Sequence, residues 1–148
     1  MKISKNLSLN EVIKSNTAIK NGIDNSPTEE HLENLKTIAE KVFQPIREHF
    51  NVPIGVSSGY RSTKLNNVIG GSSYSQHCFG EALDLDADIF GGVTNKQIFE
   101  FIRDNLEFDQ LIEEFNYSWI HVSYKEEGNR NMILKAVKEN GRTKYIKL

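Results

Sequence analysis

Two histidines and one aspartate are the residues of this chain whose side chains could together bind a metal ion. His77 and Asp84 lie seven positions apart, and His121 follows two positions after Trp119. Two imidazoles and one carboxylate are the usual protein ligands of a hydrolytic zinc site, which leaves a fourth position open to water. Such a spacing also arises by chance, so a surface-loop histidine beside a strand-end carboxylate is the alternative explanation.

The remaining histidines and the single cysteine are weaker ligand candidates. His31 and His49 lie among charged residues in or beside an expected helix, where solvated side chains are the simpler interpretation. Cys78 follows His77 directly, and neighbouring side chains point apart, so both cannot readily reach one ion. A cysteine hydrolase that uses Cys78 is a third functional hypothesis; it predicts inhibition by alkylation and indifference to chelators.

The first half of the chain predicts one long helix and one strand. Ser26-Pro27-Thr28-Glu29 predicts a helix start, with Ser26 as N-cap and Glu29 closing a capping box. Pro45 should kink or weaken the last turns. Val52–Ser57 is expected as a strand. The apolar stripe of the helix has three- and four-residue spacing and comprises Leu32, Leu35, Ala39, Val42, Phe43 and Ile46.

The second half predicts the elements that must hold the candidate ligands. Residues 81–86 alternate as a half-buried strand should, and Thr94 begins a second capping box and helix. Residues 109–115 and 119–124 form an expected antiparallel hairpin, and the tail gives a short helix from Asn129 and a strand near Tyr145. This order of elements predicts an α+β fold with a small antiparallel sheet flanked by helices.

Length, charge and composition limit the class of protein. The 148 residues predict a single domain, 1–148, and the formal charge of −2 without a basic stripe argues against a nucleic-acid partner. No segment is apolar and long enough for membrane insertion, and the N-terminus lacks the apolar region of a signal peptide. We expect a monomer that is made in the cytoplasm.

Five short motifs make the sequence resemble a known enzyme family, the zinc D-alanyl-D-alanine carboxypeptidases. That family includes VanX-type dipeptidases and phage endolysin L-alanyl-D-glutamate peptidases. Residues 15–18, 109–112 and 144–145 further resemble a small branch common in phages and prophages. The five motifs are Ser58-Gly59-Tyr60-Arg61-Ser62, Gly70-Gly71, Ser75-x-His77, Gly80-x-Ala82-x-Asp84 and Trp119-x-His121.

The resemblance implies a fold, a metal and roles for individual residues. The fold is the one shared by the hedgehog signalling domain and lysostaphin-type peptidases. The metal is zinc, held by His77, Asp84 and His121. Arg61 matches an arginine that binds substrate or stabilises the polarised carbonyl, and Ser75 is expected to line the site or to cap a turn.

One position departs from the family pattern. Many relatives carry the catalytic carboxylate three residues before the last histidine ligand, where this chain has Ser118. The preceding strand offers Glu113 and Glu114, which must point to opposite faces. Pairing Glu114 directly with His121 keeps four apolar residues on the core face, so Glu114 is the predicted general base. Those four residues are Leu111, Phe115, Ile120 and Val122.

These observations predict a zinc peptidase that cleaves peptidoglycan stem peptides. The alternative is a binding module of the same fold that keeps zinc without catalysis, which the serine at position 118 favours. Without a signal peptide, the protein would meet the cell wall after lysis, through a holin-type pore or by virion delivery. Which stem-peptide bond is cut, and whether the enzyme is an endo- or carboxypeptidase, stays open at this stage.

Overall fold

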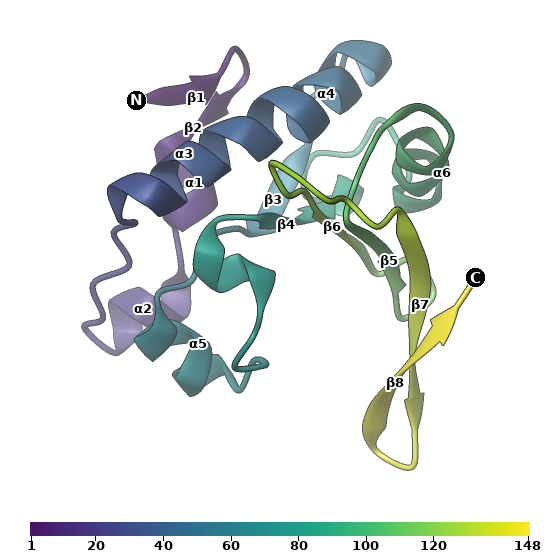
Figure 1. The fold of residues 1–148 in the computed structure, drawn as a ribbon. Coiled ribbons are helices and arrows are strands. Elements are labelled where there is room, and N and C mark those ends of the chain that lie inside the picture. Colours follow the sequence, from purple (N-terminus) through teal and green to yellow (C-terminus); the bar gives the residue numbers. More distant parts are fainter.

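A six-stranded sheet forms the centre of the molecule, and its strands lie in the order β3-β4-β6-β5-β7-β8 (Figure 1). The computed structural model describes residues 1–148. Neighbouring strands are antiparallel except for β5 and β7, which are parallel, and the predicted α+β class is confirmed. The strands are β3 (Gly55–Ser58), β4 (Ala82–Asp86), β5 (Gln110–Glu114), β6 (Trp119–Ser123), β7 (Met132–Glu139) and β8 (Arg142–Lys147).

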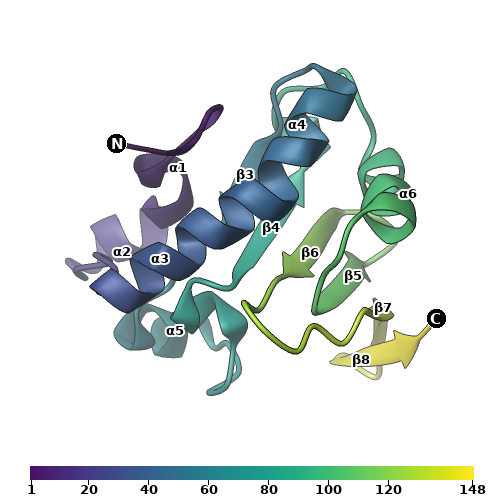
Figure 2. The ribbon, with the colours of Figure 1, turned by 45° about the horizontal axis from the view of Figure 1, so that its top comes forward.

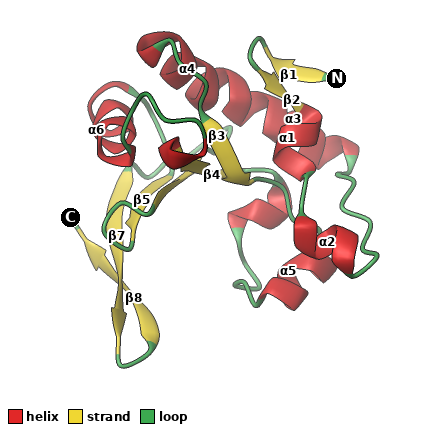
Figure 3. Cartoon of the chain, turned by 180° about the vertical axis from the view of Figure 1, so that it is seen from behind, coloured by secondary structure: helices red, strands yellow, loops and turns green.

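Helices flank this sheet, and a two-stranded sheet lies near the N-terminus (Figure 3). No helix combines the length and the apolar content needed to cross a membrane. The two short strands are β1 (Lys2–Ser4) and β2 (Leu7–Ser8). The helices are α1 (Leu9–Ile13), α2 (Asn16–Lys20), α3 (Glu29–Ile38), α4 (Gln44–Phe50), α5 (Thr63–Ile69) and α6 (Asn95–Asn105).

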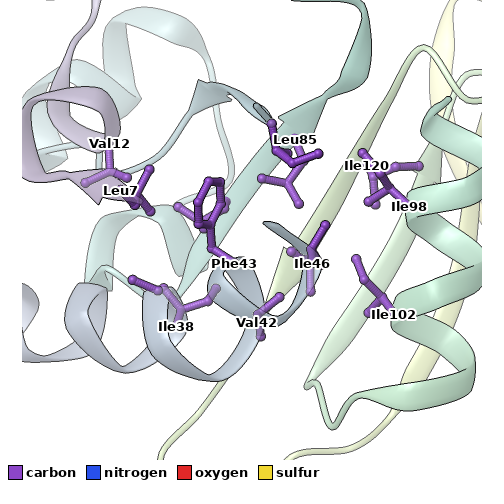
Figure 4. Close-up of a cluster of buried hydrophobic side chains, with 14 of the residues drawn as sticks. Leu7, Val12, Ile38, Val42, Phe43, Ile46, Leu85, Ile98, Ile102 and Ile120 are labelled. Carbon is purple, nitrogen blue, oxygen red and sulfur yellow. The ribbon is translucent and has the colours of Figure 1, made fainter. Parts of the chain in front are cut away.

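The hydrophobic core lies between the helices and one face of the sheet. Helices α3 and α4 form a continuous rod in front of β3 and β4 (Figure 2). Alternate strand residues point to the same face, so Leu85 of β4 and Ile120 of β6 enter this core together. The opposite face of β4 and β6 is left for polar side chains. Labelled core side chains of the rod and α6 in Figure 4 are Ile38, Val42, Phe43, Ile46, Ile98 and Ile102.

Helix α3 begins two residues later than predicted. Thr28, not Ser26, is the N-cap, because its hydroxyl oxygen accepts the His31 N–H at 3.1 Å. The backbone N–H of Ser26 instead donates to the Asp24 carboxylate at 3.0 Å, in a turn that precedes the helix. The predicted capping box at Ser26 is therefore wrong, because a local side-chain turn competes for these residues.

The disturbance expected at Pro45 is present as a wider helical turn. Residues Ala39–Phe43 form a π-helical turn between α3 and α4, in which the Gln44 N–H bonds to the Ala39 carbonyl. Pro45 follows immediately in the first turn of α4, a position where proline, which has no backbone N–H, is tolerated. The rod thus continues past Pro45 and keeps Ile46 in the core.

The segments that carry the candidate ligands differ little from the prediction. Strand β4 covers residues 82–86 but is buried on both faces, with only Asp86 partly exposed. Strand β3 starts at Gly55, later than expected, and the capping box at Thr94 is confirmed. Helix α5 was not predicted, although Ser62 caps its first turn and Gly70 ends it at a φ of 83°.

The helix predicted from Asn129 is wrong, and the C-terminal tail is a long β-hairpin. Strands β7 and β8 pair around Asn140 and Gly141, whose φ values are 52° and 75°. An Asn-Gly pair with two positive φ angles is the favoured two-residue hairpin turn. The strand expected near Tyr145 is confirmed as part of β8.

Gly80 is one of the positions where the surrounding backbone leaves no room for a side chain. Its φ is 74°, and a Cβ atom there would collide with the His31 carbonyl oxygen of α3. We expect Gly80→Ala to lower the free energy of unfolding by about 3 kcal/mol, since it adds this collision to the strain of a left-handed alanine. Gly128→Ala is the matched control, because its φ is 79° and its surroundings are open; strain alone should cost about 1 kcal/mol. Equal losses in urea denaturation would contradict the collision.

Candidate metal centre

Three separate segments of the chain bring His77, Asp84 and His121 together. His77 comes from a 3-10 turn, Gln76–Phe79, whereas Asp84 and His121 are direct cross-strand partners in β4 and β6. One oxygen or nitrogen atom from each side chain lies within 4.8 Å of the other two. Asp84 Oδ1 is 3.3 Å from His77 Nε2 and 3.0 Å from His121 Nδ1. The structure thus brings the three predicted ligands to one point.

The arrangement of these atoms fits a zinc ion. Zinc bonds to nitrogen and oxygen at about 2.0–2.1 Å in a tetrahedron, which places neighbouring ligand atoms about 3.3 Å apart. His77 Nδ1 lies 2.7 Å from the Gly59 carbonyl oxygen, to which its N–H donates. This contact leaves the lone pair of His77 Nε2 directed toward Asp84. In metal-binding histidines generally, a hydrogen bond from the ring nitrogen that does not bind the metal orients the ring in this way.

Short local contacts hold the turn that presents His77. The Ser75 hydroxyl accepts the His77 N–H at 3.3 Å, and the His77 carbonyl accepts the Arg61 N–H at 3.0 Å. Gly80 then ends the turn in a left-handed conformation. Ser75 also lines the groove above the site. It therefore has both of the roles considered for it from the sequence, capping the turn and lining the site.

Burial and charge keep the ligands in the protonation states that metals need. Burial lowers the pKa of His77, so its imidazole is neutral at pH 7. Burial opposes ionisation of Asp84, but the electrostatic influence of the two neighbouring histidines, His77 and His121, outweighs it and holds the Asp84 pKa well below its usual range. A neutral imidazole and an ionised carboxylate both offer free lone pairs.

Arg61 approaches the site from the segment that joins β3 to α5. Its Nη2 lies 3.7 Å from Asp84 Oδ2, and its Nε donates to the Ser58 hydroxyl at 3.2 Å. A third contact joins Nη1 to Asn66 Oδ1 at 3.4 Å, while the Asn66 amide donates to the Ser72 carbonyl at 2.8 Å. These contacts fix the guanidinium at the edge of the ligand cluster.

A groove of about 880 Å³ opens above the ligands. One wall comes from residues 69–76, which include the end of α5, and the other comes from the β7–β8 hairpin. Figure 1 shows α5 and this hairpin on opposite sides of β4 and β6. All the site residues predicted from the sequence line the groove: Arg61, Ser75, His77, Asp84, Glu114 and His121.

The strand register differs from the one predicted at Glu114. Ile112 is the direct partner of His121, and Glu114 pairs with Trp119, so the predicted pairing is wrong by two positions. Phe115, at a φ of 50°, belongs to the turn and lines the groove instead of the core. A shift of two preserves the face, because side chains alternate with a period of two. Glu114 therefore still shares the ligand face with His121.

The two neighbouring glutamates have separate environments. Glu113 points to the other face, and its carboxylate accepts the Tyr117 N–H at 3.2 Å within the hairpin turn. Glu114 faces the groove with a side chain only 7% exposed. Burial raises its pKa to about 7; His121 opposes this shift, and Asp84 and Glu113 add to it. Glu114 is thus the carboxylate whose position and pKa suit proton transfer.

The family of the chain follows from its sequence match. Residues 5–123 match the family described as Peptidase M15. The chain belongs to this family. M15 peptidases are zinc-dependent metallopeptidases, and the ligand cluster of this structure fits that metal. A comparison with curated proteins gives no match.

The other candidate groups of this M15 peptidase lie outside the ligand cluster. Burial raises the pKa of Cys78, which disfavours the reactive thiolate that a cysteine hydrolase needs. His49 stacks on Phe101 at 4.2 Å between ring centroids, and His31 contacts the Tyr60 hydroxyl at 3.2 Å. His49 is exposed to solvent and His31 is partly exposed, as expected, and neither belongs to the ligand cluster.

The groove residues of the C-terminal hairpin were not predicted from the sequence. Lys138, Thr143 and Tyr145 line the groove from β7 and β8, beyond the segment that matches the family. The Asn140-Gly141 pair between two strand-like segments was the signal that could have revealed this hairpin.

Zinc content tests the ligand assignment directly. We expect the purified chain to bind one zinc ion and His121→Gln to weaken binding by more than about 100-fold, because it removes one of three protein ligands. Metal analysis after dialysis and a zinc-dependent rise in melting temperature measure this. His49→Gln is the matched control, since His49 lies outside the cluster. Unchanged zinc content in His121→Gln would refute the site.

The Glu114 pKa predicts a pH dependence of stability in the chelator-treated protein. A carboxyl group whose pKa rises from 4.5 to about 7 on folding stabilises the folded state below pH 4.5. That contribution is lost as the pH rises from 4.5 through 7, because Glu114 ionises in the unfolded chain while it stays protonated in the folded protein. Glu114→Gln stays neutral, so its stability relative to wild type should increase between pH 4.5 and 7 and then level off. Urea denaturation across this range measures the difference, and a pH-independent difference would exclude the shift.

Proposed function

We propose that this M15 peptidase hydrolyses peptide bonds in bacterial peptidoglycan stem peptides, with zinc held by His77, Asp84 and His121. The observation that carries the proposal is one groove in which these ligands share a sheet face with Glu114 and lie beside Arg61. A zinc-binding module without catalysis would not require a buried carboxylate on this face.

Glu114 is the proposed general base. When bound, zinc supplies a Lewis acid that polarises the substrate carbonyl and lowers the pKa of water to about 7. Glu114 takes the proton of the attacking water and passes it to the leaving amine. Burial raises its pKa to about 7. A cation bound in the site would act in the opposite direction and lower that pKa, so the carboxylate would be ionised and ready to accept a proton at neutral pH.

Arg61 and Ser75 are proposed to bind the substrate. The Arg61 guanidinium, fixed by Ser58 and Asn66, directs its charge toward the ligand cluster, where negative charge develops on the carbonyl oxygen. Such preorganised donors stabilise an oxyanion without reorganising during the reaction. Ser75 lines the groove next to His77 and holds the turn that carries it.

The groove suits an extended peptide that carries carboxylates. It is long enough to reach from α5 to β8, and Arg61 and Lys138 supply cationic groups to its lining. Stem peptides offer both an extended backbone and free carboxylates. The motif resemblance to phage and prophage enzymes supports a lytic or wall-remodelling role. In that role, host lysis, a holin-type pore or virion delivery would bring the protein to the wall.

Replacement of each glutamate in turn separates catalysis from fold. We expect Glu114→Gln to lower kcat on purified peptidoglycan by about 10²–10⁴-fold while zinc content stays unchanged, since only proton transfer is lost. Glu113→Gln keeps an oxygen that can accept the Tyr117 N–H and should retain activity within about twofold. Release of new amino groups gives the rate, and mass analysis of the fragments identifies the bond.

Two results would contradict this function. Full activity in zinc-loaded Glu114→Gln would remove Glu114 as the base. Absence of any new amino or carboxyl termini from the zinc-loaded wild type, on peptidoglycan and on isolated stem peptides, would favour the non-catalytic binding module instead.

A further inference from the structure

The C-terminal hairpin extends the ligand-bearing face of the sheet beyond the family match. Strand β7 adds to β5 in parallel, and β8 pairs with β7, so two further strands continue the sheet past β5. The match to the family ends at residue 123, before both strands. The groove extends over both strands, so the wall they form lies outside the matched segment.

Strand register places Tyr145 in one row with Glu114. Glu114 pairs with Trp119 on one side and with Ala136 on the other, and Ala136 pairs with Tyr145. Directly paired residues share a face of the sheet. Two strand spacings separate the backbones of Glu114 and Tyr145 by about 10 Å. Only the methyl group of Ala136 lies between them in this row, so the two longer side chains border the same part of the groove.

The phenol of Tyr145 is available to a ligand and is protonated. The residue is 54% exposed and lines the groove. Partial burial raises its pKa, and the carboxylates of Glu114 and Asp84 raise it further. A neutral phenol offers a hydrogen-bond donor at neutral pH.

The hairpin fixes the backbone that carries this side chain. The turn at Asn140 and Gly141 sets the register of β7 and β8, and Lys144 pairs with Glu139 at 3.2 Å. The Leu148 N–H donates to the Ile133 carbonyl at 2.9 Å and secures the end of β8. The backbone at Tyr145 is therefore preorganised, and a ligand need not order a loop to reach this residue.

We propose that Tyr145 binds the substrate of the proposed peptidase by donating a hydrogen bond from its hydroxyl to a backbone carbonyl oxygen of the bound peptide. This role rests on the proposed function. Arg61 lies beside Asp84 at the other end of the site, whereas Tyr145 lies two strands beyond Glu114. Tyr145 thus contacts the peptide away from the bond that is cut. Such a contact is equally strong in the ground state and the transition state, so it lowers KM and leaves kcat unchanged.

Trp119 allows peptide binding to be measured without turnover. It is the single tryptophan of the chain, and it lines the groove in the same row as Glu114. Its fluorescence in zinc-loaded Glu114→Gln protein reports the binding of a synthetic stem pentapeptide, L-alanyl-D-glutamyl-L-lysyl-D-alanyl-D-alanine. Steady-state hydrolysis of the same peptide by protein with Glu114 intact gives kcat and KM.

Tyr145→Phe is the deciding variant, because it removes only the hydroxyl. We expect it to raise both the Kd and KM about tenfold, the effect of one lost hydrogen bond, with kcat changed by less than about twofold. Tyr124→Phe is the matched control: it removes the hydroxyl of a tyrosine packed against the core and should alter none of these constants. Circular dichroism confirms that both variants are folded.

The outcomes separate this proposal from the proposed function. Unchanged Kd and KM in Tyr145→Phe, with wild-type binding and turnover intact, would overturn the role of Tyr145 alone. A fall in kcat at constant KM would also overturn it, because that result would place the hydroxyl at the reacting bond. Failure of the wild type to bind and cleave the peptide would instead refute the proposed substrate, and the role of Tyr145 on that substrate with it.

Discussion

The direct pairing of β4 with β6 is the constraint on which the site depends. It places Asp84 opposite His121 on one face, and a buried carboxylate in that position needs compensating partners. His77 and His121 contact one oxygen of this carboxylate, and Arg61 approaches the other. The strand pairing buries the Asp84 carboxylate, which water cannot fully solvate, and polar side chains surround it as its partners.

The same two strands bind the site to the hydrophobic core. Leu83 and Leu85 alternate with Asp84 along β4, and Ile120 and Val122 flank His121 along β6; all four apolar side chains are fully buried. Burial of apolar surface under the α3–α4 rod and α6 therefore also orients the ligands. The strands that build the core thus also position two of the three ligands, and only His77 comes from a turn outside the sheet.

Patterns within single elements were predictable from the sequence, whereas contacts that depend on competing local bonds were not. The residues around Asp84 and His121 alternate clearly enough to predict both strands, and the correct face for Glu114 followed from the period of two. The exact register did not follow, because three consecutive left-handed residues, Phe115–Tyr117, lengthen the turn. At Ser26, a bond to Asp24 competed with the expected cap. The contact of His77 with the Gly59 carbonyl joins distant backbone segments, which no sequence pattern encodes.

The floor of the groove, where the metal ligands lie, and its outer wall, the β7–β8 hairpin, are held in the fold in different ways. Two of the three ligands, Asp84 and His121, come from strands in the middle of the sheet, each held by a neighbour on both sides, whereas β8 is an edge strand attached through its own hairpin. A substitution in the floor disturbs the core, but one on the outer hairpin changes only the shape of the wall. Evolution or protein engineering can therefore vary what this scaffold recognises while its metal-binding centre is inherited intact.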